Sequence, residues 1–129
     1  MIETSDHSTL HVQLAAQPDE VPRVRQAVRD WLHSAGNRCD WFTAELLVSE
    51  LVTNALLHAL PPLEVRVQAL GAAGVRIEVF DADRDRLPSR DEFPLDADNG
   101  RGLEIIGALA SRWGTESTSA GKLVWAELD

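Results

Sequence analysis

The stretch VSELVTNALLHA, residues 48–59, combines the apolar composition of a core helix with a row of polar side chains. Glu50, Asn54 and His58 are four residues apart, so on a helix each differs from the last by roughly 40° in direction. The three side chains therefore form one slowly turning stripe. Buried polar groups cost free energy unless another group bonds them. The stripe is either the solvated edge of the helix or the wall of a site.

The overall composition narrows the class of protein. A chain of 129 residues forms one domain, residues 1–129, and can bury a real core. The formal net charge of −9 argues against a nucleic-acid partner, because proteins that bind a phosphate backbone carry a basic surface. Cys39 is the only cysteine, which excludes an internal disulfide. Without an apolar run of roughly 20 residues or a signal peptide, we expect a cytoplasmic protein with no membrane partner.

The first half of the chain predicts one strand and two helices. Apolar and polar residues alternate over residues 10–14, as in a half-buried strand. Apolar residues then recur at helical spacing from about residue 18 to 36, where a glycine ends the helix. Asp40 is a suitable N-cap for the second helix, residues 41–59, which Pro61 stops. The polar stripe lies on this second helix.

The centre of the chain predicts an antiparallel hairpin followed by a long loop. Residues 63–69 and 75–79 alternate in polarity on either side of the turn 71–74, which we expect to be a four-residue loop. Residues 81–99 are polar and show no periodicity. A connection of nearly 20 residues without secondary structure is more often a functional lid than a neutral linker.

The remaining residues complete the expected fold. A short helix at 103–111 and two strands at 112–117 and 122–128 follow the loop. Five strands and three helices in this order favour an α+β fold. We expect a two-layer sandwich in which a five-stranded mixed sheet is covered on one face by the three helices.

Two further motifs carry little weight individually. The glycines of Gly100-Arg101-Gly102 precede a helix, where exposed N–H groups and the positive end of the helix dipole suit a phosphate, although glycines are common at helix starts. Asp81 follows an apolar strand, and such a residue usually only ends the strand.

Their order along the chain is more specific. The sequence resembles the GHKL superfamily of ATP-binding domains, in which Glu-x-x-x-Asn on a helix is followed by a strand ending in Asp-x-Gly-x-Gly, a lid and Gly-x-Gly-Leu. The segments VSELVTNALLHA, EVFDADRDRLP and NGRGLEIIGALASRWG occur here in that order, and GKLVWAEL resembles the last strand of the family. The likeness covers nearly the whole chain. It is strongest to the small RsbW-like anti-sigma-factor kinases and implies the histidine kinase-like ATPase fold.

The resemblance implies roles for three residues around the nucleotide. Asn54 would hold Mg²⁺ through its amide oxygen, which is a hard ligand for a hard cation. Glu50, one helical turn earlier, would act as the general base or position the nucleophile. Asp81 would accept a hydrogen bond from the adenine amino group.

The resemblance also assigns the phosphate end of the site. Gly100 and Gly102 would let the backbone approach the phosphates, next to the positive end of the following helix. Arg101 would either contact the phosphates or point to solvent. His58 fits a structural role at the end of its helix as well as a role in the site.

Three positions depart from the pattern of the family. Asp83 and Asp85 stand where the family has the two glycines after Asp81, so two further carboxylates lie near the entry of a polyanion. Leu123 is expected to stand where the kinases have a threonine that binds adenine through water. Losing that hydroxyl removes one polar contact, worth about 1 kcal/mol.

The sequence therefore leaves two functions open. The first is an anti-sigma factor with Mg²⁺- and ATP-dependent serine/threonine kinase activity toward a STAS-type anti-sigma-factor antagonist. Such a kinase regulates transcription by binding a sigma factor directly, and proteins of this type commonly form homodimers. The second is a binding module of the same fold that holds its partners without phosphorylating them. The pair Glu50 and Asn54 favours the kinase, whereas Asp83, Asp85 and Leu123 favour the module.

Overall fold

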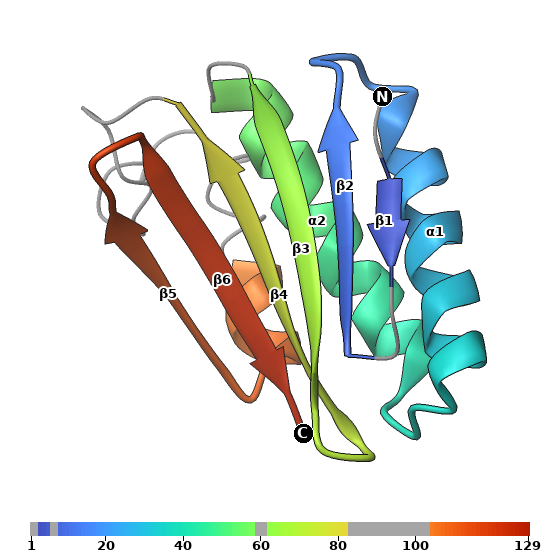
Figure 1. The fold of residues 1–129 in the computed structure, drawn as a ribbon. Coiled ribbons are helices and arrows are strands. Elements are labelled where there is room, and N and C mark those ends of the chain that lie inside the picture. The colour runs from blue at the N-terminus through green and yellow to red at the C-terminus, as the bar shows by residue number, and fades with distance from the viewer. Residues whose placement is uncertain (1–2, 6–7, 59–61, 83–103) are drawn as a thin grey trace.

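The strands form one six-stranded sheet with the spatial order β1-β2-β3-β4-β6-β5 (Figure 1). The structure, a computed structural model, describes residues 3–5, 8–58, 62–82 and 104–129. The strand bounds are β1 Glu3–Ser5, β2 Thr9–Leu14, β3 Leu63–Leu70, β4 Gly74–Asp81, β5 Arg112–Ser117 and β6 Lys122–Leu128.

The sheet corrects the expected arrangement in two respects. The short strand β1 adds a sixth member at the edge, next to β2, and three residues are too few to show an alternating pattern in the sequence. Every pair of described strands is antiparallel, so the expected mixed sheet is wrong. The reason is that β6 returns between β4 and β5 and opposes both of them.

Helices cover one face of this sheet, as expected for an α+β sandwich (Figure 1). They are α1, Glu20–Ala35, α2, Trp41–His58, and a short helix at 104–109. Gly36 ends α1 with a φ of 63°, which a residue with a side chain rarely adopts. Asp40 caps α2, because its Oδ1 accepts a hydrogen bond of 3.2 Å from the backbone N–H of Thr43.

The hydrophobic core lies between the helices and the covered face of the sheet. Leu47 and Leu51 of α2 and the strand residues Val65 and Ile77 are at most 1% exposed. Alternate residues of a strand point to opposite faces, so the intervening side chains lie on the face without helices. We call that side the open face. The β3–β4 hairpin agrees with the sequence pattern, but its loop has three residues, because Leu70 already pairs with Gly74.

The loop between α1 and α2 is attached to the β3–β4 turn. Asn37 is 5% exposed, and its Oδ1 accepts a hydrogen bond of 2.8 Å from the backbone N–H of Cys39. Its Nδ2 donates to the carbonyl oxygen of Gly74 at 3.1 Å. The backbone N–H of Arg38 donates to the carbonyl oxygen of Ala72 at 2.7 Å. These bonds place the start of α2 beside the start of β4, so the two elements run in the same direction (Figure 1).

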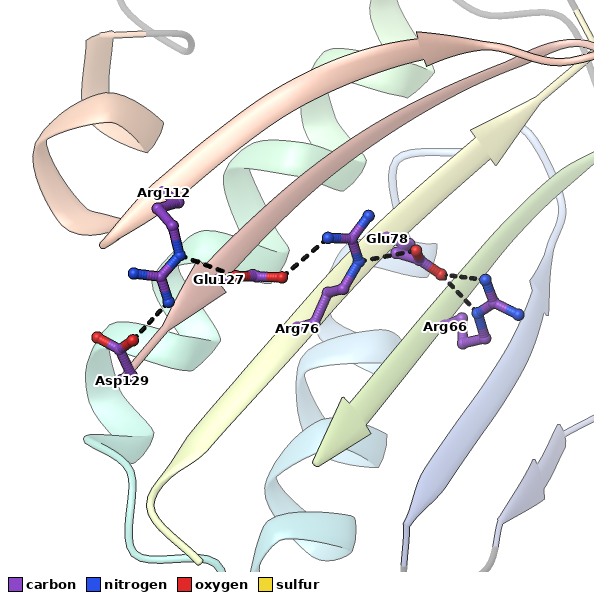
Figure 2. Close-up of polar contacts among 6 residues, drawn as sticks. All are labelled: Arg66, Arg76, Glu78, Arg112, Glu127 and Asp129. Atoms are coloured by element: carbon purple, nitrogen blue, oxygen red, sulfur yellow. Dashed lines mark hydrogen bonds and ion pairs between the residues drawn. The ribbon is translucent and has the colours of Figure 1, made fainter. Parts of the chain in front are cut away.

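A continuous row of ion pairs crosses the open face (Figure 2). Its charges alternate in sign across four strands, in the order Arg66, Glu78, Arg76, Glu127, Arg112 and Asp129. Arg76 lies 2.8 Å and Arg112 2.9 Å from the carboxylate of Glu127. Hydrogen bonds from Arg76 and then Arg112 lower the pKa of this carboxyl. The six charges of this row are thus satisfied by one another.

Candidate functional site

The candidate site lies where α2 and β4 end. An 18-residue helix is roughly 27 Å long and an eight-residue strand roughly 26 Å, so two elements that start together also finish together. Asn54 lies roughly 20 Å along α2, and Asp81 roughly 23 Å along β4. Figure 1 shows the ends of the helix and the strand at the same edge of the molecule. The fold therefore brings these two predicted residues to one end of the interface between helix and sheet.

Asn54 is buried in a way that suits a ligand. Its side chain is 6% exposed, yet it makes no hydrogen bond with any described residue. Arg25 Nε is the one fully buried side-chain atom without a partner in the described part of the chain, so neither amide atom of Asn54 is both sealed from solvent and unbonded. A buried amide without partners costs free energy. Its oxygen could supply one ligand to Mg²⁺.

Glu50 lies one turn before Asn54 on α2 and is half-buried. Burial raises the pKa of its carboxyl above the usual range, because a partly dehydrated carboxylate is less stable than the neutral acid. No described residue forms an ion pair with it. A raised pKa makes a carboxylate a better proton acceptor near neutral pH. Glu50 is thus a half-buried carboxylate with a raised pKa and no described ion-pair partner.

The carboxylate of Asp81 lies beside a buried lysine that the sequence analysis did not select. Asp81 and Lys122 are paired in the register of β4 and β6, and both are on the helix-covered face. Their side chains are only 3% and 4% exposed, and Lys122 Nζ lies 3.7 Å from Asp81 Oδ2. Asp81, the residue expected to accept a hydrogen bond from adenine, thus has the ammonium of Lys122 next to it.

Leu123 does not occupy the position expected for it. Its side chain lies on the open face, where it lines a hollow with Phe80 and Glu64. Neighbouring residues of a strand face opposite sides, so an error of one residue in the register exchanged the two faces. Lys122 is the residue of β6 on the same side as Asp81. The sequence feature that could have identified Lys122 is Gly121, the turn glycine directly before it. The strand that starts after this turn pairs Lys122 with Asp81, the last residue of β4.

Several predicted positions lie outside the described residues. They are Asp83 and Asp85, the lid, and the segment Gly100, Arg101 and Gly102. The side chain of His58 is outside them as well. Within the described ranges, no group of three or more His, Cys, Asp or Glu side chains could hold a metal ion. No helix of the same ranges is long and apolar enough to cross a membrane.

A comparison with known protein families shows which family the chain belongs to. The family model of the histidine kinase-like ATPase domain matches residues 14–128, which is nearly the whole chain. The chain belongs to the histidine kinase-like ATPase domain family. The matched range includes the helix with Glu50 and Asn54, the strand that ends at Asp81, and β6. No curated protein matches the chain.

Two solved structures share the fold of this chain. One contains the RsbU and RsbW domains of Rv1364c from Mycobacterium tuberculosis, with a TM-score of 0.68, 23% identity and 93% of this chain covered. Another is the histidine kinase domain of the blue-light activated histidine kinase EL346 from Erythrobacter litoralis, with a TM-score of 0.52, 18% identity and 97% covered. The chain spans 32% and 64% of these two chains.

Proposed function

We propose that the chain is an anti-sigma factor that phosphorylates a serine or threonine of an anti-sigma-factor antagonist, with Mg-ATP as the phosphoryl donor. The observation that carries the proposal is the pair Glu50 and Asn54 on α2, at the end of the interface where Asp81 ends β4. A binding module of the same fold has no need of a half-buried carboxylate next to a buried amide, neither of which has a partner among the described residues.

Each residue would contribute a separate function. Mg²⁺, when bound, would neutralise charge on the phosphates, and the amide oxygen of Asn54 would be one of its ligands. Glu50 would accept the proton of the substrate hydroxyl as its oxygen bonds to the γ-phosphorus. The bond from that phosphorus to the β–γ bridging oxygen would break, and ADP would leave. Asp81 would accept a hydrogen bond from the amino group of adenine.

The partners follow from the class of kinase. We propose a sigma factor as the protein that the chain sequesters, and a STAS-type antagonist as the substrate whose phosphorylation preserves that complex. The similarity in fold to a chain with an RsbW domain supports this choice. The chain would act in the cytoplasm, where sigma factors act, and as a homodimer.

The test is phosphoryl transfer by a variant that cannot take a proton. Proteins captured by the chain from its native host are incubated with radiolabelled ATP and either wild type or Glu50→Gln. We expect the substitution to preserve nucleotide binding and to slow transfer roughly 100-fold or more, because it removes the base and keeps the shape of the side chain.

Glu45→Gln is the matched control on the same helix. The carboxylate of Glu45 is held by Arg29 at 2.6 Å and is not part of the proposed site, so transfer should continue at the wild-type rate. Failure of the wild type to label any protein that binds it would contradict the kinase. Continued partner binding in that case would support the binding module, the second function that the sequence left open.

A further inference from the structure

The ion pair between Asp81 and Lys122 is unusual for its position in the sheet. On the open face, Arg66, Arg112 and Asp129 are each about half exposed, so their charges are solvated as well as paired. Asp81 and Lys122 lie on the covered face, and both side chains are almost completely excluded from solvent. Removing two charges from water costs several kcal/mol per ion, and their attraction often fails to recover it. A pair so deeply buried is therefore poorly explained by stability alone.

The local backbone holds the pair in place. A Cβ atom at Gly121 would lie 1.9 Å from the carbonyl oxygen of Asp81, so only glycine allows β6 to begin this close to the end of β4. Thr118 fixes the preceding turn, because its Oγ1 accepts hydrogen bonds from the backbone N–H groups of Ala120 at 3.2 Å and Gly121 at 3.0 Å. Lys122 is thereby fixed directly across from Asp81.

The distance within the pair leaves the ammonium of Lys122 able to donate a hydrogen bond to a third group. At 3.7 Å, Lys122 Nζ and Asp81 Oδ2 attract each other but are farther apart than hydrogen-bonded atoms. An ammonium has three N–H donors, and a carboxylate has about four acceptor positions. The pair therefore presents a donor and an acceptor side by side, at the end of the interface that also holds Asn54.

We propose that Lys122 is a specificity-determining residue that reads the purine base together with Asp81. Lys122 donates a hydrogen bond to N1 of adenine, while Asp81 accepts one from the adjacent N6 amino group. This inference rests on the proposed binding of ATP and deepens it, because it assigns both edge atoms of the base to side chains. The lysine would replace the water-mediated contact of the threonine in the related kinases, a contact that the sequence led us to expect to be lost at Leu123.

The test compares Mg-ADP with Mg-1-deaza-ADP, in which a C–H group replaces N1, by titration calorimetry. The wild type should bind the deaza nucleotide roughly tenfold or more weakly, as expected for losing a hydrogen bond to a charged group. Lys122→Met should bind both nucleotides equally and no more tightly than the wild type binds the deaza form. Lys122→Gln keeps an N–H donor and should retain part of the preference.

Two controls separate recognition from folding. Lys122→Met leaves Asp81 buried without its cation, so each titration is run well below the melting temperature of that variant. Arg66→Met removes a cation from the open face of the same sheet, where Glu78 keeps Arg76 as a partner, and it should bind both nucleotides as the wild type does.

The outcomes distinguish this inference from the proposed function. Equal affinity of the wild type for ADP and 1-deaza-ADP, or a full preference in Lys122→Met, would overturn the role of Lys122 and leave ATP binding intact. If the wild type bound Mg-GDP as tightly as Mg-ADP, the proposal that Lys122 and Asp81 recognise adenine would also be wrong. If the wild type binds no nucleotide, both the inference and the proposed function are wrong.

Discussion

Asn37 and Asn54 are two buried asparagines near opposite ends of α2, and their surroundings differ. Asn37, 5% exposed, uses both ends of its amide for hydrogen bonds to the backbone, at Cys39 and Gly74. Asn54, 6% exposed, makes no such bond with the described residues. The two asparagines are therefore equally buried, but only Asn37 has hydrogen-bond partners among the described residues. The first amide contributes to the stability of the fold, and we propose that the second binds a ligand.

The same contrast separates two glutamates of α2. Glu45 is 7% exposed and is bonded by the guanidinium of Arg29 at 2.6 Å and 3.2 Å. Glu50 has no ion-pair partner among the described residues, and burial alone raises the pKa of its carboxyl. At the start of α2 the buried polar groups are thus bonded to their neighbours, whereas Glu50 and Asn54 have no such partner within the described ranges. Substitutions in the two parts should affect different properties.

The largest effect is expected at Asn54. Mg-ADP at about 100 times its dissociation constant should stabilise the wild type by about 2.7 kcal/mol and raise the melting temperature by roughly 10 °C. Asn54→Ala should abolish this increase, as should removal of Mg²⁺ by a chelator. The melting temperature without nucleotide should hardly change, since no described hydrogen bond is lost. An equal shift in wild type and variant would exclude Asn54 from the site.

Asn37→Ala is the matched control and should behave in the opposite way. The substitution leaves the N–H of Cys39 and the carbonyl of Gly74 buried without partners, which should lower the free energy of unfolding by about 2 kcal/mol. The increase in melting temperature with Mg-ADP should persist. If Asn37→Ala kept its stability but lost the increase in melting temperature with Mg-ADP, the roles assigned to Asn37 and Asn54 would be wrong.

The smallest effect is expected at Glu50 and depends on pH. Its pKa is raised in the folded state above the ordinary 4.5, so its contribution to stability is fully present below pH 4.5 and is lost as the pH rises through the folded-state pKa. Glu50→Gln removes this loss. The variant should therefore melt at a slightly higher temperature than the wild type at pH 7, and the advantage should disappear toward pH 4.

The control for this comparison is again Glu45→Gln. Because Arg29, the partner of Glu45, is 51% exposed and solvent screens its charge, the substitution should lower the melting temperature at pH 7 only slightly. Thermal melts of the three proteins between pH 4 and pH 8 measure both effects. A Glu50→Gln advantage that grew toward acid pH would contradict the raised pKa.

The sequence predicted the elements well because their physical signals are local. Alternation located β2, β3 and β4, and the cap Asp40 fixed the start of α2. The four-residue spacing correctly placed Glu50 and Asn54 on one helix. Their burial was not predictable, because an amphipathic stripe looks the same whether solvent or another layer of the fold lies beside it.

The errors concern relations between distant segments. The position of β6 between β4 and β5 depends on how the chain crosses the sheet, and no local pattern encodes it. The choice of Leu123 over Lys122 arose because β6 has apolar residues on both faces, so its alternation does not reveal which face is covered. Pairing with β4 decides it, and places the lysine beside Asp81.

The most direct test of the account observes the two asparagine side chains while nucleotide is added. Their NH₂ groups give separate signals in a proton–nitrogen correlation spectrum, and each is assigned by its absence from the corresponding alanine variant. We expect saturating Mg-ADP to shift the side-chain signals of Asn54 and to leave those of Asn37 in place. Bound Mg-ADP that moved the signals of Asn37 and not those of Asn54, or that moved neither, would contradict the claim that this end of α2 is the nucleotide site.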